Sequence, residues 1–130
     1  MLIITIRTDK PEAELGLYDD AKQLVYLKWE AHRELAETIH QQIRTMLVGQ
    51  HKSLSDCGAV AVYQGPGSFT GLRIGISVAN ALAYSLHIPI VARTGNDWIE
   101  QCALAISKNE NSHVVIPEYG ALPNITAPRK

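Results

Sequence analysis

Residues 64 to 75 read Gln64-Gly-Pro-Gly-Ser-Phe-Thr-Gly-Leu-Arg-Ile-Gly75, and this stretch decides the fold. It follows an apolar run at 59–63 that predicts a buried strand, and it opens into an apolar-periodic helix at 70–87. A strand that turns through glycines into a helix leaves unpaired backbone N–H groups at the start of that helix. Such groups favour an anion, so the turn is a candidate for phosphate binding as well as for tight packing.

Two phosphate-binding motifs fail on this turn. The P-loop needs four residues between its glycines and then a lysine, whereas Gly65 and Gly71 enclose five residues and Leu72 follows. The dinucleotide fingerprint needs a glycine where Thr70 stands and an acidic residue after the next strand, which is followed by Arg93. The turn therefore matches neither motif.

Tight packing is the other interpretation of the turn. Pro66 would fix φ, Gly67 would adopt a positive φ, and Ser68 or Thr70 would cap the helix. Residue physics alone leaves a packing turn and a binding turn both open.

The order of elements around the turn predicts the fold class. Three antiparallel strands followed by alternating helices and strands favour an α/β domain, with one mixed sheet and helices packed on it. This domain covers 1–108, and a short irregular tail covers 109–130. The predicted strands are at 1–8, 13–18, 23–29, 58–63, 88–92 and 113–116, and the predicted helices are at 33–48, ending at Gly49, at 70–87, and at 97–107, capped by Thr94 with Asp97.

Composition narrows the class of protein. The chain has 130 residues, which suits a single domain, and a net charge of −1 with no basic stripe, which argues against strong direct binding of nucleic acid. Cys57 and Cys102 lie far apart among apolar residues, as expected for reduced, buried thiols in a cytoplasmic protein. The sequence has no apolar run of membrane-spanning length, and the first strand does not resemble a signal peptide.

The helix at 70–87 has two distinct sides. One side carries leucines and an isoleucine at 72, 76, 82 and 86, which can face the sheet. The other side carries small residues spaced by four, which let another helix approach closely. That helix is either the one at 33–48 in the same chain or a helix of another subunit. The small strip consists of Gly71, Gly75, Ala79 and Ala83.

The segment Gln64 to Ile76 resembles the signature of the bacterial tRNA threonylcarbamoyladenosine biosynthesis family TsaB, also called YeaZ. The resemblance continues through Ala79-Asn-Ala-Leu-Ala83 and Ile88-Pro-Ile-Val91, and it is weaker in the tail at 117–126. It implies a single actin-like ATPase domain (ASKHA, ribonuclease H-like). It also implies a minimal form of the family that lacks most of the second domain.

The resemblance implies a role as a non-catalytic scaffold subunit. Members of the family bind a larger paralogue, TsaD, which carries the metal and transfers threonylcarbamoyl to the tRNA adenosine next to the anticodon. A small ATPase, TsaE, joins them, so ATP and metal belong to the partners, and tRNA is reached only through the complex. We therefore expect no catalytic residue, metal or cofactor of this chain's own, and no membrane contact.

In the family, the pairing with TsaD uses the first two helices, here 33–48 and 70–87. The resemblance and the small strip together predict a partner interface made of Leu35, Ile39, Ile43, Gly71, Gly75, Ala79 and Ala83. The signature turn consists of Gly65, Pro66, Gly67, Ser68, Phe69, Thr70, Gly71 and Arg73. Arg73 either reaches a partner carboxylate or phosphate, or is a solvated helix residue.

One departure from the family pattern bears on nucleotide chemistry. Actin-like ATPases hold hydrated magnesium with an acidic residue at the turn after the first strand. Here that stretch reads Ile6-Arg7-Thr8-Asp9, so an arginine takes the place of the usual aspartate. We therefore expect no nucleotide hydrolysis by this chain. Two alternatives stay open, a nucleotide-binding actin-like domain and a homodimeric module that self-associates through the small strip.

The remaining candidate chemistry is weak. None of the five histidines stands in a pattern typical of metal binding. Ser68 lacks the Gly-x-Ser-x-Gly elbow of a hydrolase nucleophile. The sequence therefore predicts a binding surface and not an active site.

Overall fold

The chain begins with a meander of three antiparallel strands, β1 (Leu2–Arg7), β2 (Glu12–Asp19) and β3 (Lys22–Glu30). The computed structural model describes residues 1–67 and 69–118. The turn between β2 and β3 is short, and Asp20 in it adopts a φ of 53°, which aspartate tolerates better than most residues. The three predicted strands are confirmed.

Helices and parallel strands follow the meander in alternation. The sheet order is β3-β2-β1-β4-β5, and β4 pairs in parallel with both β1 and β5, which makes the sheet mixed as predicted. The later elements are the 3₁₀ turns η1 (His32–Glu34) and η2 (Leu54–Asp56), the helices α1 (Leu35–Gly49), α2 (Phe69–Leu86) and α3 (Trp98–Ser107), and the strands β4 (Cys57–Tyr63) and β5 (Ile90–Arg93).

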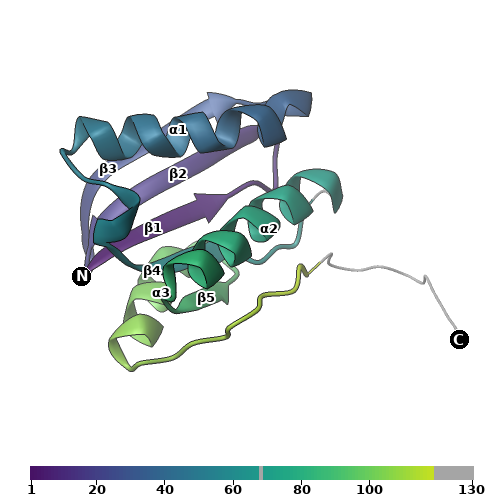
Figure 1. Ribbon diagram of the computed structural model, residues 1–130. Coiled ribbons are helices and arrows are strands. Elements are labelled where there is room, and N and C mark those ends of the chain that lie inside the picture. Colours follow the sequence, from purple (N-terminus) through teal and green to yellow (C-terminus); the bar gives the residue numbers. More distant parts are fainter. Residues whose placement is uncertain (68, 119–130) are drawn as a thin grey trace, which may run out of the picture.

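The helices form a layer on each face of the sheet. Helices α1 and α2 cover one face, and α3 covers the β4–β5 part of the other (Figure 1). Alternation along the first strand explains this division, because successive side chains point to opposite faces. Thr8 contacts α2, whereas Arg7 lies over the ring of Tyr63, which itself meets Trp98 of α3 edge to face.

The core lies mainly between the sheet and the α1–α2 layer. Central strands supply fully buried branched side chains such as Ile4, Ile6 and Val62. Helix α1 is also tied to the edge strand by a hydrogen bond of 3.0 Å that Trp29 Nε1 donates to Thr38 Oγ1. The buried residues of α1 repeat at helical spacing, as its sequence period predicts; they are Leu35, Ile39, Ile43, Met46 and Leu47.

The small strip of α2 packs against its own sheet and does not form a separate smooth side. Ala79 is fully buried, and a Cβ at Gly75 would collide with Thr8 Oγ1. The same hydroxyl donates a hydrogen bond of 2.8 Å to the carbonyl of Gly71. The prediction that the strip receives another helix is therefore wrong, since its neighbours are the sheet and the turn between β1 and β2. The strip is small because the backbone of α2 comes this close.

Two local predictions are also wrong. Residues 113–116 form no strand; instead the side-chain amide of Asn80 holds Val115, donating to its carbonyl at 3.0 Å and accepting from its N–H at 2.9 Å. Helix α3 begins after Asp97, whose carboxylate caps no backbone N–H and accepts a bond from Gln101. Helix α1 ends at Gly49 as predicted, and His51, with a φ of 57°, provides the positive φ with which the chain leaves it.

Part of the predicted tail, 119–130, and Ser68 lie outside the described residues, so the boundary at 108 stays a prediction. Within residues 1–67 and 69–118, no helix has the length and apolar character needed to cross a bilayer.

We predict that Gly75→Ala destabilises the fold, because the new Cβ has no room beside Thr8. Overpacking of this kind costs about 1–3 kcal/mol. Urea unfolding followed by circular dichroism measures it. Gly49→Ala is the matched control, because a Cβ there meets nothing within 4 Å, and it should be neutral or stabilise by up to about 1 kcal/mol. Equal midpoints for Gly75→Ala and the unmodified chain would contradict the packing described above.

The two thiols should be unreactive in the folded chain. Both are buried, and burial raises the pKa of Cys57 to about 11 and that of Cys102 to about 12. An ordinary thiol has a pKa of about 8.5, so folding disfavours the thiolate, and stability should fall as the pH rises above about 8.5. At pH 8 we expect slow labelling by a thiol reagent in buffer and fast labelling of both cysteines in urea. Rapid labelling of the native chain would show that a thiol is accessible.

Candidate partner-binding surface

The glycine turn is closed on both sides by other parts of the chain. Gly65 has a φ of 128°, and a Cβ there would meet the carbonyl oxygen of Glu118. A Cβ at Gly67 would meet Asp9, in the turn between β1 and β2. The positive φ thus belongs to Gly65 and not to Gly67 as predicted. Both glycines are needed for close approach, which supports the packing interpretation of the turn.

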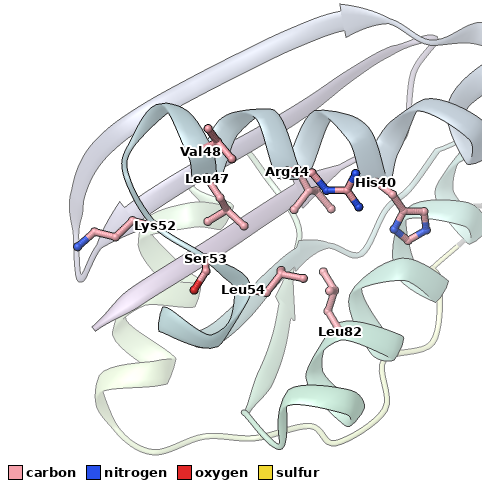
Figure 2. A pocket seen from close by; sticks show the side chains of 9 residues that line it. His40, Arg44, Leu47, Val48, Lys52, Ser53, Leu54 and Leu82 are labelled. Carbon is pink, nitrogen blue, oxygen red and sulfur yellow. The ribbon is translucent and has the colours of Figure 1, made fainter.

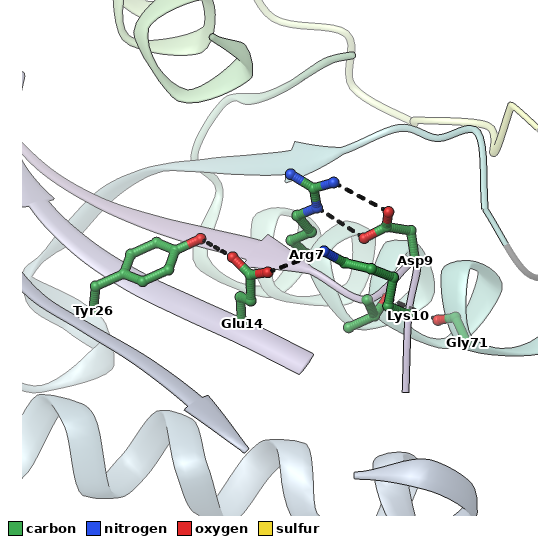
Figure 3. Close-up of polar contacts among 7 residues, drawn as sticks. Arg7, Asp9, Lys10, Glu14, Tyr26 and Gly71 are labelled. Carbon is green, nitrogen blue, oxygen red and sulfur yellow. Dashed lines mark hydrogen bonds and ion pairs between the residues drawn. The ribbon is translucent and has the colours of Figure 1, made fainter. Parts of the chain in front are cut away.

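Arg7 and Asp9 neutralise each other beside this turn. Arg7 Nε donates to Asp9 Oδ1 at 2.8 Å, and Nη2 donates to Oδ2 at 3.2 Å (Figure 3). The hydrogen bonds to Asp9 raise the pKa of Arg7, and its guanidinium carbon lies 4.0 Å from the centre of the Tyr63 ring. Both oxygens of Asp9 are therefore occupied by a cation of the same chain, which competes with any hydrated metal ion. Among the described residues, no group of three or more potential metal-ligating side chains gathers at one point.

A second polar cluster fixes the start of β2. The Tyr26 hydroxyl donates to Glu14 Oε1 at 2.5 Å, and Lys10 Nζ lies 3.9 Å from Glu14 Oε2 (Figure 3). Glu14 is 8% exposed, so these partners compensate a buried carboxylate. Burial, followed by the bond to Glu14, raises the pKa of Tyr26. The cluster holds the β1–β2 turn in place.

The solvent side of the α1–α2 layer carries a groove of about 300 Å³. Its apolar floor comes from Ile43 and Leu47 of α1, Leu54 of η2 and Leu82 of α2 (Figure 2). Val48 at its edge is 64% exposed. We call this feature the α1–α2 groove, and its lining is completed by His40, Arg44, Lys52 and Ser53.

The groove combines exposed apolar groups with basic ones. Arg44, Lys52 and His40 stand around the apolar floor, and the lining includes no acidic side chain. An apolar floor with a charged rim is the usual build of a surface that binds another protein.

The structure places the predicted interface residues mostly in the core. Leu35, Ile39, Gly75, Ala79 and Ala83 are buried, and Gly71 is half-buried, so a partner cannot reach most of these side chains. Both helices turn those positions towards the sheet, so these side chains support the core, and their contact with a partner stays a prediction. Ile43 is the one member that also lines the α1–α2 groove.

The signature turn is only partly available to a partner. Pro66, Thr70 and Arg73 are exposed, whereas Gly65 is buried. Ser68 and the side chain of Phe69 lie outside the described residues. Val48 and Leu54 were not predicted from the sequence. The available signal was an apolar residue off the core face of α1 (Val48) and another apolar residue in a polar loop (Leu54).

Comparison with known proteins identifies the relatives of this chain. The family model described as "TsaD: tRNA N6-adenosine threonylcarbamoyltransferase" matches residues 29–112. The tRNA threonylcarbamoyladenosine biosynthesis protein TsaB of Escherichia coli K12 is 34% identical over 91 residues, which cover 70% of this chain and 39% of that protein. A tRNA N6-adenosine threonylcarbamoyltransferase of Geotalea uraniireducens is 43% identical over 76 residues, 58% of this chain and 21% of that protein.

Solved structures give the same assignment. YeaZ from Pseudomonas aeruginosa superposes with a TM-score of 0.67 at 27% identity, over 72% of this chain and 43% of that one. RuvC of T. thermophilus, at 16% identity and a TM-score of 0.50 over 72% of this chain and 64% of that one, shares the fold alone. These likenesses confirm an α/β domain of the actin-like, ribonuclease H-like class. The chain spans about two fifths of the length of the TsaB relatives it matches.

We predict that the chain does not bind ATP with magnesium. The Arg7–Asp9 pair occupies the carboxylate that follows the first strand, so magnesium would have to displace a bidentate guanidinium. Titration calorimetry with MgATP up to millimolar concentration should show no saturable heat. Clear saturable binding would instead favour the nucleotide-binding alternative.

Proposed function

The chain belongs to the family of tRNA threonylcarbamoyladenosine biosynthesis proteins that comprises TsaB (YeaZ) and TsaD, and we propose that it serves this modification as a non-catalytic, cytoplasmic scaffold subunit. The matches to TsaB proteins and the fold shared with YeaZ support this proposal. Arg7 already binds both carboxylate oxygens of Asp9, which competes with metal binding there and supports a non-catalytic role. In the complex, ATP and metal would come from a TsaD-type paralogue and a TsaE-type ATPase, and tRNA would be reached through the complex.

The α1–α2 groove is the observation that carries the proposal. Helices α1 and α2 leave an apolar floor between them with Leu54 at one end, 39% exposed (Figure 2). An amphipathic helix places its apolar side chains in such a groove. The TsaD-type paralogue is the partner that we propose for it, with one helix lying across α1 and α2.

The positive charge around the α1–α2 groove indicates which charge the partner helix should carry. Arg44, Lys52 and His40 surround the floor without an acidic neighbour in the lining. Complementary charge raises the association rate and excludes wrong partners. The partner helix should therefore carry aspartate or glutamate beside its apolar side chains.

The same rim weighs against the homodimer alternative. A symmetric dimer through the α1–α2 groove would place the same surface of two copies against each other. Arg44 and Lys52 of one copy would then face the like charges of the other, which is unfavourable. A heterodimer with an acidic helix relieves this repulsion.

The proposal is tested by measuring the affinity for the TsaD-type paralogue of the same genome. Val48→Asp should weaken binding at least about tenfold, because it places a carboxylate at the edge of an apolar floor and opposite an acidic helix. Leu104→Asp is the matched control, since Leu104 is 57% exposed on α3, on the opposite face of the sheet, and it should bind normally. Biolayer interferometry with both purified proteins gives the two affinities.

Two results would contradict the proposal. One is the absence of any complex between the unmodified chain and the paralogue at micromolar concentration. The other is equal affinity for Val48→Asp and Leu104→Asp, which would move the interface away from the groove. Sedimentation of the chain alone tests the homodimer, and we expect a monomer.

A further inference from the structure

A second cavity, of about 540 Å³, lies where the β1–β2 turn meets η1 and the start of α2. It shares no lining residue with the α1–α2 groove. We call it the basic pocket, and its lining consists of Lys10, Pro11, Ala31, His32, Arg33, Leu35, Thr70, Gly71 and Ile74.

The basic pocket gathers three cationic or titratable basic side chains from two separate segments. The side chains of Lys10 and His32 are 54% and 63% exposed, and no lining residue is acidic. Each of these two side chains has an acidic partner outside the lining. Lys10 Nζ lies 3.9 Å from Glu14 Oε2, and His32 Nε2 lies 3.0 Å from Glu30 Oε1.

Arg33 differs from these two side chains. Within residues 1–67 and 69–118, no acidic group lies within 4.0 Å of its guanidinium. Thr70, from α2, adds an exposed residue with a hydroxyl to the lining, and Pro11 and Ile74 add apolar surface. The positive charge of the pocket is therefore only partly neutralised, and Arg33 is the main donor left to bind an anion.

We propose that the basic pocket binds a phosphate group of an RNA backbone. Guanidinium and ammonium groups are the usual protein ligands of phosphate oxygens, and the threonine hydroxyl can donate a further bond. The apolar lining can receive a ribose, and a cavity of this size holds more than the phosphate alone. Recognition of this kind positions the RNA and reads no sequence.

The lining favours a phosphodiester over a nucleoside triphosphate. A triphosphate normally arrives with magnesium, which needs carboxylate or other oxygen ligands. The pocket lining offers no carboxylate. A backbone phosphate carries a single charge and needs no metal, so it matches what the pocket contains.

The choice of RNA rests on the proposed function in tRNA modification. The chain has a net charge of −1, so a single phosphate site gives weak binding by the chain alone and adds to the affinity of a complex. In that complex, the scaffold would orient the RNA while the partner acts on it.

The test is an NMR titration of the ¹⁵N-labelled full chain with a short RNA hairpin, and in parallel with MgATP. Saturable shifts of the Arg33, Thr70 and Gly71 amides with RNA are expected. The double variant Lys10→Ala/Arg33→Ala should weaken RNA binding about tenfold. The plot of log K against log salt concentration, whose slope is negative, should also become less steep, by about 0.7 for each phosphate that the variant no longer neutralises.

A matched double variant, Lys22→Ala/Lys108→Ala, removes the same charge at two exposed sites away from the pocket and should bind RNA like the unmodified chain. Equal RNA affinity of the two double variants overturns the proposal, because binding would then depend on net charge alone. Absence of saturable shifts at the pocket also overturns it. Shifts there that saturate with MgATP at lower concentration than with RNA overturn the choice of RNA.

Partner binding separates this proposal from the proposed function. Lys10→Ala/Arg33→Ala should keep its affinity for the TsaD-type paralogue, since the α1–α2 groove is untouched. If the paralogue does not bind the unmodified chain while the RNA shifts at the pocket persist, the scaffold role fails and the phosphate site stands. If the paralogue binds and the RNA shifts are absent, the phosphate site alone fails.

Discussion

The close approach of α2 to the β1–β2 turn is the contact on which the other features depend. Thr8 donates to the carbonyl of Gly71 and occupies the space that a side chain at Gly75 would need. This contact sets how deeply α2 lies on the sheet. It also brings Gly67 against Asp9, which places the signature turn over the end of β1. A larger residue at Gly67 or Gly75 would push the helix and the turn away from the sheet together.

Because the small strip is used inside the molecule, the outward side of the α1–α2 layer is left to other residues. Val48 and Leu54, whose side chains are exposed and not part of the core, line the α1–α2 groove. At the other end of the same layer, Lys10 and Arg33 stand around the basic pocket. The α1–α2 layer and the segments that flank it thus offer an apolar surface suited to a protein and a cationic one suited to phosphate. The two surfaces are separate, so each can be altered without the other.

Most of the secondary structure could be predicted, and the candidate site could not. The strands of the meander alternate, and α1 has a clear helical period, so local patterns indicated both their type and their place. Helix α2 has two stripes at helical spacing, one large and one small, and periodicity alone cannot tell which of them faces the sheet. Both Leu72 and Ala79 are in fact buried, so α2 presents a broad face to the sheet that includes the small strip. For this reason the sequence alone could not separate the residues of α2 that face the sheet from those that a partner can reach.

The sequence by itself determined the family, the order of the elements and the mixed sheet, because a long signature and hydrophobic periods are local properties of the chain. It also determined that Arg7 replaces an acidic residue. Only the tertiary structure decided that Arg7 binds Asp9, that Thr8 fills the space beside Gly75, and that Leu54 joins Leu82 in the α1–α2 groove. Apart from the Arg7–Asp9 bond, each of these involves residues far apart in the chain. These long-range contacts depend on how closely two elements pack, which no local pattern records.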